Sequence, residues 1–207
     1  MIAIIDYDMG NLRSVQKAFE KVGCSVIVTR DPKAIRDASH VVLPGVGAFP
    51  DAMKNLERFE LIDPIVKGIG QGKPFLVLCL GLQLLFTEGE EFGIHRGLDV
   101  VKGRVVRFRI SNNGTKTKLS IPHMGWNTIR IKAPSPLFKG VPNGSYFYFV
   151  HSYYVVPEDG RWISTTTEYG LEFASSVWKD NIFACQFHPE KSQEQGLKLL
   201  KRFTEMG

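Results

Sequence analysis

The chain has 207 residues, of which 43% are hydrophobic and 23% are charged, and its formal net charge is +5. This composition is typical of a folded protein with a large core and excludes a disordered chain. The Lys and Arg residues form no basic stripe and no apolar run reaches the length of a membrane span, so neither nucleic acid nor a membrane is an expected partner.

The first part of the chain alternates apolar runs with segments of helical periodicity. The predicted strands cover residues 2–5, 25–29 and 40–43. Residues 11–22 form a predicted helix that stops at Gly23, and a second helix is predicted after Asp31, an N-cap residue followed by proline. This order predicts an α/β fold with a doubly wound, mostly parallel central sheet and helices on both faces.

The third predicted strand runs into the turn Gly45-Val46-Gly47. Two glycines around one residue leave the backbone free to turn its N–H groups toward a ligand. Alone, the pattern is more typical of a tight turn, since it lacks the further glycine of a dinucleotide fingerprint and the lysine of a P-loop. Its position at the end of a strand favours the ligand-binding interpretation, because ligands of open parallel sheets bind beyond the carboxyl ends of the strands.

A nucleophile lies between the next strand and the next helix. After a helical segment over residues 50–70, residues 75–78 form an apolar run typical of a buried strand, and residues 80–86 begin a predicted buried helix. Cys79 lies between them, as in a nucleophile elbow, where the following backbone N–H groups stabilise a thiolate or an oxyanion. The alternative is a core cysteine, the commoner environment for cysteine in an apolar run.

From residue 97 onward the pattern changes to short β segments and turns, which predicts an antiparallel β extension of the sheet. An acidic loop over residues 87–93 precedes this part. Ser192 opens a closing helix, and Gln195 stands where a capping box requires it. The predicted strands cover residues 104–110, 126–131, 146–156, 162–167, 175–178 and 182–186, with a hairpin signal at 112–114 and a surface loop over 133–144.

A histidine and a carboxylate follow the last predicted strand. His188 is of the type that takes a thiol proton, and Glu190 is of the type that orients an imidazole. The alternative is a turn histidine beside a solvated carboxylate. Together with Cys79 the two residues predict a nucleophile, a base and an orienting acid. Gln83 lies one helical turn after Cys79, so it either bonds a ligand there or is a buried amide satisfied by backbone.

The three cysteines of the chain have no metal-ligand spacing. Cys24 and Cys185 are interpreted as structural, and the odd number favours free thiols in a reducing cytoplasm. The first residues lack the basic start and long apolar region of a secretory signal peptide. The sequence therefore predicts a cytoplasmic protein without a metal site.

Two motifs together resemble those of the class I, triad-type glutamine amidotransferases. They are Leu-Cys-Leu-Gly-Leu-Gln at 78–83 and Gln-Phe-His-Pro-Glu at 186–190. His-Met-Gly-Trp-Asn at 123–127 and Pro-Glu-Lys-Ser at 189–192 are similar to one branch, the glutaminase subunits of imidazole glycerol phosphate synthase in histidine biosynthesis. The resemblance runs through essentially the whole chain and implies a single glutamine amidotransferase type-1 domain over residues 1–207.

The resemblance implies an enzyme that hydrolyses L-glutamine to glutamate and ammonia through a glutamyl thioester. In this interpretation Cys79 is the nucleophile, His188 is the base that Glu190 orients, and the backbone N–H groups of Val46 and Leu80 form the oxyanion hole. The positions that match the family's glutamine-holding residues are Gly47, Gln83, Glu91, Ser152 and Tyr153.

The resemblance also implies a partner. Ammonia would pass, within a heterodimer, to a (β/α)₈-barrel cyclase subunit that makes imidazole glycerol phosphate and AICAR, and no metal or organic cofactor is implied. An isolated subunit is expected to be nearly inactive, with the Gly45-Val46-Gly47 turn aiming a carbonyl where the oxyanion needs an N–H. The positions that match the docking face are Asn11, Trp126, Asn127, Tyr148 and Lys191.

Two positions depart from the family pattern, and two alternatives stay open. Val77 and Asp8 stand where the family usually has glycine, which bears on local geometry without removing a catalytic group. One alternative is the glutaminase of another pathway, such as pyridoxal phosphate synthase, against which residues 123–127 and Lys191 argue. The other is a catalytically silent binding subunit, which the intact triad residues disfavour.

Overall fold

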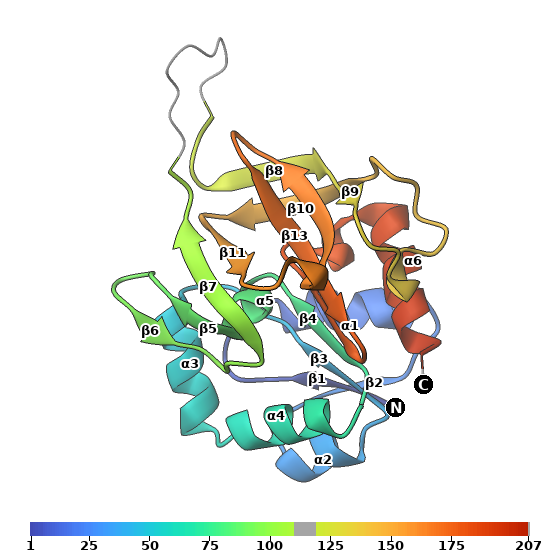
Figure 1. The fold of residues 1–207 in the computed structure, drawn as a ribbon. Coiled ribbons are helices and arrows are strands. Elements are labelled where there is room, and N and C mark those ends of the chain that lie inside the picture. Colours follow the sequence, from blue (N-terminus) through green and yellow to red (C-terminus); the bar gives the residue numbers. More distant parts are fainter. Residues whose placement is uncertain (110–118, 207) are drawn as a thin grey trace.

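The N-terminal part of the chain builds a parallel group of strands (Figure 1). The computed structural model describes residues 1–109 and 119–206. The strands pair in parallel in the order β2-β1-β3-β4-β14, which confirms the doubly wound, mostly parallel sheet and brings the carboxyl ends of β3, β4 and β14 to one edge. Their bounds are β1 (Ile2–Ile5), β2 (Val26–Thr29), β3 (His40–Leu43), β4 (Phe75–Leu78) and β14 (Ile182–Cys185).

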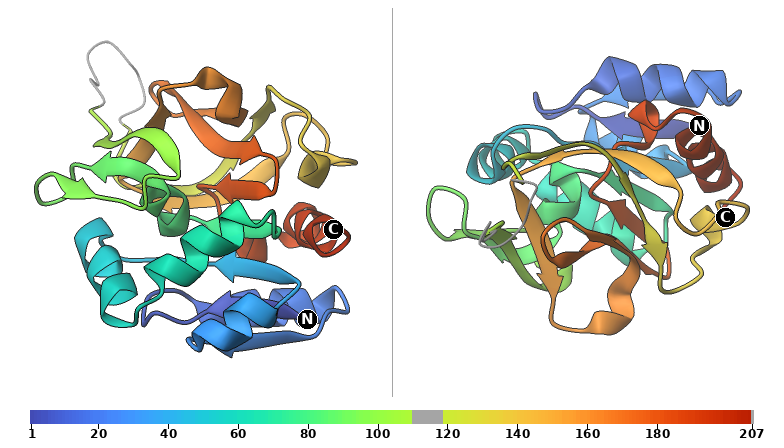
Figure 2. Two further views of the ribbon diagram at one scale, coloured as in Figure 1. Left: turned by 60° about the horizontal axis from the view of Figure 1, so that its bottom comes forward. Right: turned by 90° about the horizontal axis from the view of Figure 1, so that it is seen from above.

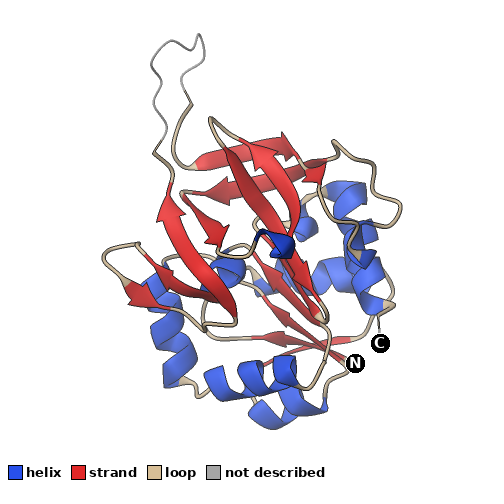
Figure 3. Cartoon of the chain, in the orientation of Figure 1, coloured by secondary structure: helices blue, strands red, loops and turns tan. Residues whose placement is uncertain are grey.

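Beyond β14 the sheet continues with mostly antiparallel pairs, which confirms the predicted β extension. The order is β13-β11-β7-β5-β6, with β12 on β13, β9 on β12, and a parallel pair between β5 and β7. Figure 3 shows these strands above the helix-covered part of the molecule. Their bounds are β5 (Phe86–Gly89), β6 (His95–Arg96), β7 (Val101–Arg107), β9 (Arg130–Ile131), β11 (Tyr153–Pro157), β12 (Ile163–Glu168) and β13 (Glu172–Lys179).

A second, two-stranded antiparallel sheet consists of β8 (His123–Thr128) and β10 (Tyr146–His151). In the left view of Figure 2 this region, in yellow and orange, lies above the blue N-terminal elements. The short 3₁₀ turns are η1 (Pro136–Phe138), η2 (Gly160–Trp162) and η3 (Pro189–Lys191). Because β10 leads directly into β11 of the main sheet, the two sheets meet next to the carboxyl ends of β4 and β14.

Helices cover both faces of the parallel strands. Alternate residues of each strand point to opposite faces, so Ile2 and Ile4 join a core with α1 and α6, whereas Ala3 and Ile5 join a core with α2 to α5. The helices are α1 (Leu12–Lys21), α2 (Pro32–Asp37), α3 (Phe49–Arg58), α4 (Ile62–Gly70), α5 (Leu80–Leu84) and α6 (Gln193–Thr204). Within the described residues, none of them has the length and apolar character needed to cross a membrane.

Several predicted boundaries differ from the structure for local reasons. The helical segment over 50–70 is two helices, interrupted near Glu60, whose φ is +56°. The helix after Cys79 ends at Leu84, and Phe86 instead begins β5, so part of the predicted acidic loop is a strand. The predicted surface loop over 133–144 contains the buried turn η1. The hairpin signal at 112–114 lies outside the described residues.

The predicted capping box at the closing helix is wrong. The Ser192 side chain makes no capping bond to α6. Instead its hydroxyl donates to the His188 carbonyl at 2.6 Å and accepts from the Tyr148 N–H at 3.0 Å. The serine therefore fastens the segment that carries His188 and Glu190, and Gln195 Oε1 has no hydrogen-bond partner among the described residues.

Candidate active site

The turn from β4 into α5 has the geometry of a strained elbow. Cys79 has φ +53° and ψ −110°, a backbone conformation that a non-glycine residue adopts at a cost of about 1–3 kcal/mol. The Cys79 N–H donates to the Cys185 carbonyl of β14 at 2.8 Å, which holds the elbow against the neighbouring strand. A Cβ on Gly81 would lie 2.6 Å from the Leu43 carbonyl oxygen, so this close approach requires glycine.

Val77 fits beneath this elbow without opening it. Its side chain is fully buried on the face of β4 that packs against α2 to α5, and a Cβ on Gly81 would lie 2.8 Å from its Cγ1. The missing side chain of Gly81 therefore leaves room for Val77. Asp8, the other departure, has φ +63°, and its carboxylate binds Arg30 at 2.7 Å, so a surface ion pair accompanies the left-handed backbone.

His188 and Glu190 follow β14, the parallel neighbour of β4, so the sheet brings them to the same edge as Cys79. His188 Nδ1 donates to Glu190 Oε1 at 2.7 Å, and both side chains are 2% exposed. Burial alone would lower the pKa of His188, but the Cys79 thiolate and the Glu190 carboxylate raise it to about 10. His188 Nε2 makes no hydrogen bond within the described residues, and it lines the same pocket as the thiol.

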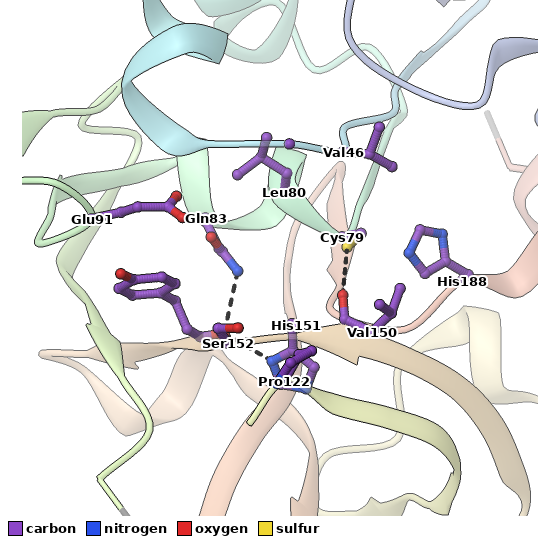
Figure 4. A pocket seen from close by; sticks show the side chains of 12 residues that line it. Val46, Cys79, Leu80, Gln83, Glu91, Pro122, Val150, His151, Ser152 and His188 are labelled. Carbon is purple, nitrogen blue, oxygen red and sulfur yellow. Dashed lines mark hydrogen bonds between the residues drawn. The ribbon is translucent and has the colours of Figure 1, made fainter. Parts of the chain in front are cut away.

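The thiol itself contacts two other groups, of which Figure 4 shows the first, the Val150 carbonyl. Cys79 Sγ donates to the Val150 carbonyl at 3.9 Å, and Gln186 Nε2 donates to the sulfur at 3.7 Å. The same sulfur lies close enough to His188 to raise the pKa of that imidazole.

The glycine turn after β3 presents a carbonyl to the elbow. The Leu80 N–H donates to the Gly45 carbonyl at 3.3 Å. Because a trans peptide directs its C=O and N–H in opposite directions, the Val46 N–H of the same peptide points away from Leu80. The preceding peptide is anchored, since the buried Tyr7 hydroxyl donates to the Pro44 carbonyl at 2.7 Å.

These elements enclose a pocket of about 250 Å³ (Figure 4). Glu190 lies behind His188 and does not line the pocket. None of the five predicted docking residues lines it either. The predicted residues that the pocket brings together are Val46, Gly47, Cys79, Leu80, Gln83, Glu91, Ser152, Tyr153 and His188.

The whole chain matches a known family. The family model described as glutamine amidotransferase class-I matches residues 3–206. The chain belongs to the class I glutamine amidotransferase family. As a member of this family it is a glutaminase enzyme, which confirms the activity predicted from the motifs.

The relatives of this amidotransferase specify the branch. It is 56% identical to the imidazole glycerol phosphate synthase subunit HisH of Syntrophotalea carbinolica over 206 residues, which cover 100% of both chains. It is 54% identical to the subunit of the same name from Geobacter sulfurreducens, with 99% and 98% covered. The structure of PurLQS from Thermotoga maritima shares the fold, with a TM-score of 0.70, 18% identity, and 99% and 97% covered.

The amidotransferase pocket also contains residues that the sequence did not assign to it. Pro122, Val150 and His151 line the pocket, and the buried Tyr7 and Gln186 support it from behind. Gln186 opens the Gln-Phe-His-Pro-Glu motif, which is the one signal that could have indicated it. Val150 acts through its backbone carbonyl, for which the sequence carries no signal.

Two of the glutamine-holding candidates already make bonds within the amidotransferase. The Gln83 side-chain amide donates to the Tyr153 carbonyl at 3.3 Å and to Gln186 Oε1 at 3.1 Å. Glu91 Oε2 accepts from the Phe49 N–H at 2.8 Å, which satisfies a donor at the start of α3. Both side chains are therefore held in place before a ligand arrives. Gln83 is thus a buried amide bonded to a backbone carbonyl, as one of the two interpretations predicted, and it also lines the pocket.

The predicted docking residues do not all share one face of the β8–β10 sheet. Trp126 is 46% exposed, its ring lies 6.1 Å from that of Tyr148, and Lys191 Nζ lies 5.8 Å from the Tyr148 ring. Asn127 points to the opposite face, where its amide donates to His123 and to the Glu168 carbonyl. Asn11 is exposed and caps α1, the helix that contacts η3.

No metal centre is seen in the part of the amidotransferase that the structure describes. Among residues 1–109 and 119–206, no three His, Cys, Asp or Glu side chains gather in a way that could hold a metal ion. Cys24, Cys79 and Cys185 are all free thiols. Burial in the core raises the pKa of Cys185 well above its usual value, which keeps that thiol protonated.

Proposed function

We propose that this chain hydrolyses L-glutamine with the Cys79–His188–Glu190 triad, as the glutaminase subunit of imidazole glycerol phosphate synthase in histidine biosynthesis. The observation that carries the proposal is that Cys79, at a left-handed elbow, shares one pocket with an imidazole that Glu190 holds in a single orientation. The full-length likeness to HisH subunits supports the pathway. The matched span of residues 3–206 supports one amidotransferase domain over residues 1–207.

The chemistry begins with proton transfer from Cys79 to His188 Nε2. The raised pKa of His188 favours the imidazolium, and Glu190 stabilises it through Nδ1. The thiolate attacks the side-chain amide carbon of glutamine, which places a negative charge on the amide oxygen. His188 then protonates the leaving nitrogen, so ammonia departs and a glutamyl thioester remains. Water, deprotonated by His188, hydrolyses the thioester to glutamate and restores the Cys79 thiol.

The developing oxyanion needs donors that the resting turn does not supply. Its first donor, the Leu80 N–H, is occupied by the Gly45 carbonyl, and the Val46 N–H points away. Rotation of the Gly45–Val46 peptide would free the first donor and add the second. One oxyanion donor is typically worth about 10²–10³ in turnover. The isolated subunit is therefore expected to be nearly inactive until a partner favours the rotated peptide.

The proposed partner is a (β/α)₈-barrel cyclase subunit that receives the ammonia in a heterodimer. Met124, Trp126 and Tyr146 are 62%, 46% and 61% exposed on β8 and β10, an apolar group of the kind that protein interfaces cover. Lys191 lies beside this face and directly follows Glu190, so a partner carboxylate bound there would touch the triad segment. The three free thiols favour the reducing cytoplasm as the location.

A glutaminase assay with and without the purified cyclase tests the proposal. We expect little turnover alone and an increase of at least a hundredfold in the complex with the cyclase ligand. Cys79→Ser should abolish glutamine-dependent synthesis, because serine is far harder to deprotonate, whereas synthesis from ammonium salts should persist. Glutamine turnover in Cys79→Ser would show that another residue is the nucleophile. A wild-type complex without turnover would favour a silent binding subunit.

A further inference from the structure

Two buried histidines outside the proposed chemistry lie directly against each other. His123 begins β8 and His151 ends β10, and the two are cross-strand partners in the small sheet. They are 2% and 6% exposed, and His123 Nδ1 lies 2.9 Å from His151 Nε2. His151 also lines the glutamine pocket. The contact therefore joins the interior of the small sheet to the wall of the site.

The partners of the two rings fix where every proton lies. His151 Nδ1 lies 2.8 Å from the Tyr153 carbonyl, which only accepts, so Nδ1 carries the hydrogen and Nε2 is an acceptor. His123 Nδ1 must then donate to His151 Nε2, which leaves His123 Nε2 as an acceptor. The Asn127 amide meets that need, because its Nδ2 lies 3.2 Å away. For neutral rings, this pattern of partners places the hydrogen of both at Nδ1.

The same carbonyl leads onward to the nucleophile. Tyr153 O also accepts from the amide of Gln83, which in turn donates to Gln186 Oε1. The amide of Gln186 donates to Cys79 Sγ. One chain of hydrogen bonds begins at Asn127, and another ends at the Cys79 sulfur. The two chains meet at the Tyr153 carbonyl. Figure 4 shows the bonds of Gln83 and His151 converging on this part of the pocket wall.

The surroundings hold the pair in the neutral state. Burial lowers the pKa of His151 to about 3 and that of His123 to about 4. An added proton on His151 Nε2 would face the His123 Nδ1–H across 2.9 Å, and one on His123 Nε2 would face the Asn127 amide donor across 3.2 Å. The His123 ring also stacks on Tyr169 at 4.0 Å and on Phe149 at 4.9 Å, so aromatic packing is the rival explanation for its presence. A phenylalanine would serve such packing equally well.

We propose that His123 and His151 are positioning residues, whose fixed tautomers hold the Tyr153 carbonyl and so align Gln83, Gln186 and Cys79 for glutamine. The inference rests on the proposed glutaminase function. Neither histidine touches the reacting atoms, and Asn127 acts as the first donor of its chain of hydrogen bonds rather than as a docking contact. Without this chain of hydrogen bonds, the segment that carries Ser152 and Tyr153 loses the bond from His151 to the Tyr153 carbonyl, which sets its position in the pocket wall.

The tautomers can be measured without any activity. Long-range ¹H–¹⁵N correlation spectra of the full chain should show His123 and His151 both neutral and protonated at Nδ1 at pH 7. An Nε2-protonated His151, or a charged ring of either residue, would overturn the proposal. Because this measurement needs no turnover, it stands even where the complex proves to have no glutaminase activity.

The activity arm uses the complex with the cyclase. His123→Phe keeps the stacked ring and removes both bonds, so kcat/KM for glutamine should fall about threefold to tenfold, as for one lost hydrogen bond. His123→Asn returns an amide donor near the Nδ1 position and should restore kcat/KM to within about twofold of wild type. Tyr169→Phe, which removes only the hydroxyl bond to the Ser120 carbonyl, is the matched control and should leave kcat/KM unchanged.

The outcomes separate positioning from packing. Wild-type kcat/KM in His123→Phe, or equal losses in His123→Asn and His123→Phe, would overturn the positioning role. If His123→Phe does not fold, the tautomer spectra and His123→Asn still decide, because the asparagine should then support both folding and glutamine turnover. An asparagine variant that folds but keeps less than a tenth of wild-type kcat/KM would count against the proposal.

Discussion

Replacing Gly45 by alanine should test whether this turn needs glycine because of the limited space around it or because of its backbone conformation. The φ of Gly45 lies outside the left-handed region, so alanine can adopt the same backbone. The new Cβ would nevertheless lie 2.7 Å from the Gly81 nitrogen, 2.7 Å from the Tyr7 hydroxyl and 3.0 Å from the Leu80 Cβ. Ordinary contact begins near 3.4 Å, so the turn or the elbow must move by several tenths of an ångström.

The size of the effect follows from what must move. Overpacking against backbone atoms costs about 1–3 kcal/mol of unfolding free energy, and each kcal/mol shifts the melting temperature of a chain this size by about 2–4 °C. The displaced groups are the peptide that carries the Val46 N–H and the backbone beside Leu80. Since oxyanion donors act at about 2.7–3.1 Å, a shift of this size should reduce kcat in the complex by about 10²-fold.

The assay is glutaminase turnover in the complex with the cyclase, beside thermal unfolding of the free chain. Gly70→Ala is the matched control, because Gly70 ends α4, nothing lies within 4 Å of its added Cβ, and alanine favours a helix. The control should keep full activity and equal or greater stability. A Gly45→Ala protein with wild-type kcat and melting temperature would refute the contact argument.

Four further changes test other parts of the site. The pKa of His188 is raised from 6.5 to about 10 on folding, so its stabilising contribution is complete below pH 6.5 and is lost as the pH rises to 10. Urea unfolding from pH 6 to 10 should show a smaller loss in Cys79→Ala, and equal losses would contradict the cause given for the shift. A Cβ on Gly196 would overlap the Pro189 carbonyl oxygen, so Gly196→Ala should lower kcat in the complex at least tenfold; an unchanged kcat would argue against a rigid triad turn. Val77→Gly should lower the unfolding free energy by about 2–4 kcal/mol while kcat stays within tenfold of wild type, and an inert wild type that becomes active in this variant would show that Val77 disables the site. Lys191→Ala should reduce activation by the cyclase and its ligand with little change in melting temperature, and an equal loss of both would indicate a structural role.

The sequence predicted the parallel sheet and the triad because both depend on local patterns. The apolar run over residues 75–78 and the residues Cys79 and Gly81 specify a strand, a turn and a nucleophile without reference to distant parts of the chain. His188 and Glu190 belong to one short motif at the end of a strand. The family match and the HisH relatives confirm the activity class and the branch that these motifs indicated.

What the sequence missed depends on pairing between distant segments. The periodicity around Phe86 predicts a helix. Phe86 instead pairs with Val101 and begins a strand, because tertiary contacts outweigh local preference. The sequence around Ser192 predicts a helix cap, but the Ser192 hydroxyl bonds to the backbone of His188 and Tyr148 instead. The contact between His123 and His151 follows from a cross-strand register that no single-sequence pattern contains.

The backbone of Tyr148 ties the exposed sheet to the segment that carries His188 and Glu190. Its carbonyl accepts from the His188 N–H at 2.9 Å, and its N–H donates to Ser192, which also holds the His188 carbonyl. Any substitution that reshapes the strand around Tyr148 to suit a different partner would therefore also displace His188, the proposed base. Partner choice and catalytic alignment are then inherited as one trait. Such a surface should change over evolution only together with the partner protein that covers it. Pairing this subunit with a partner from a distant species should therefore lower glutamine turnover before it weakens binding between the subunits.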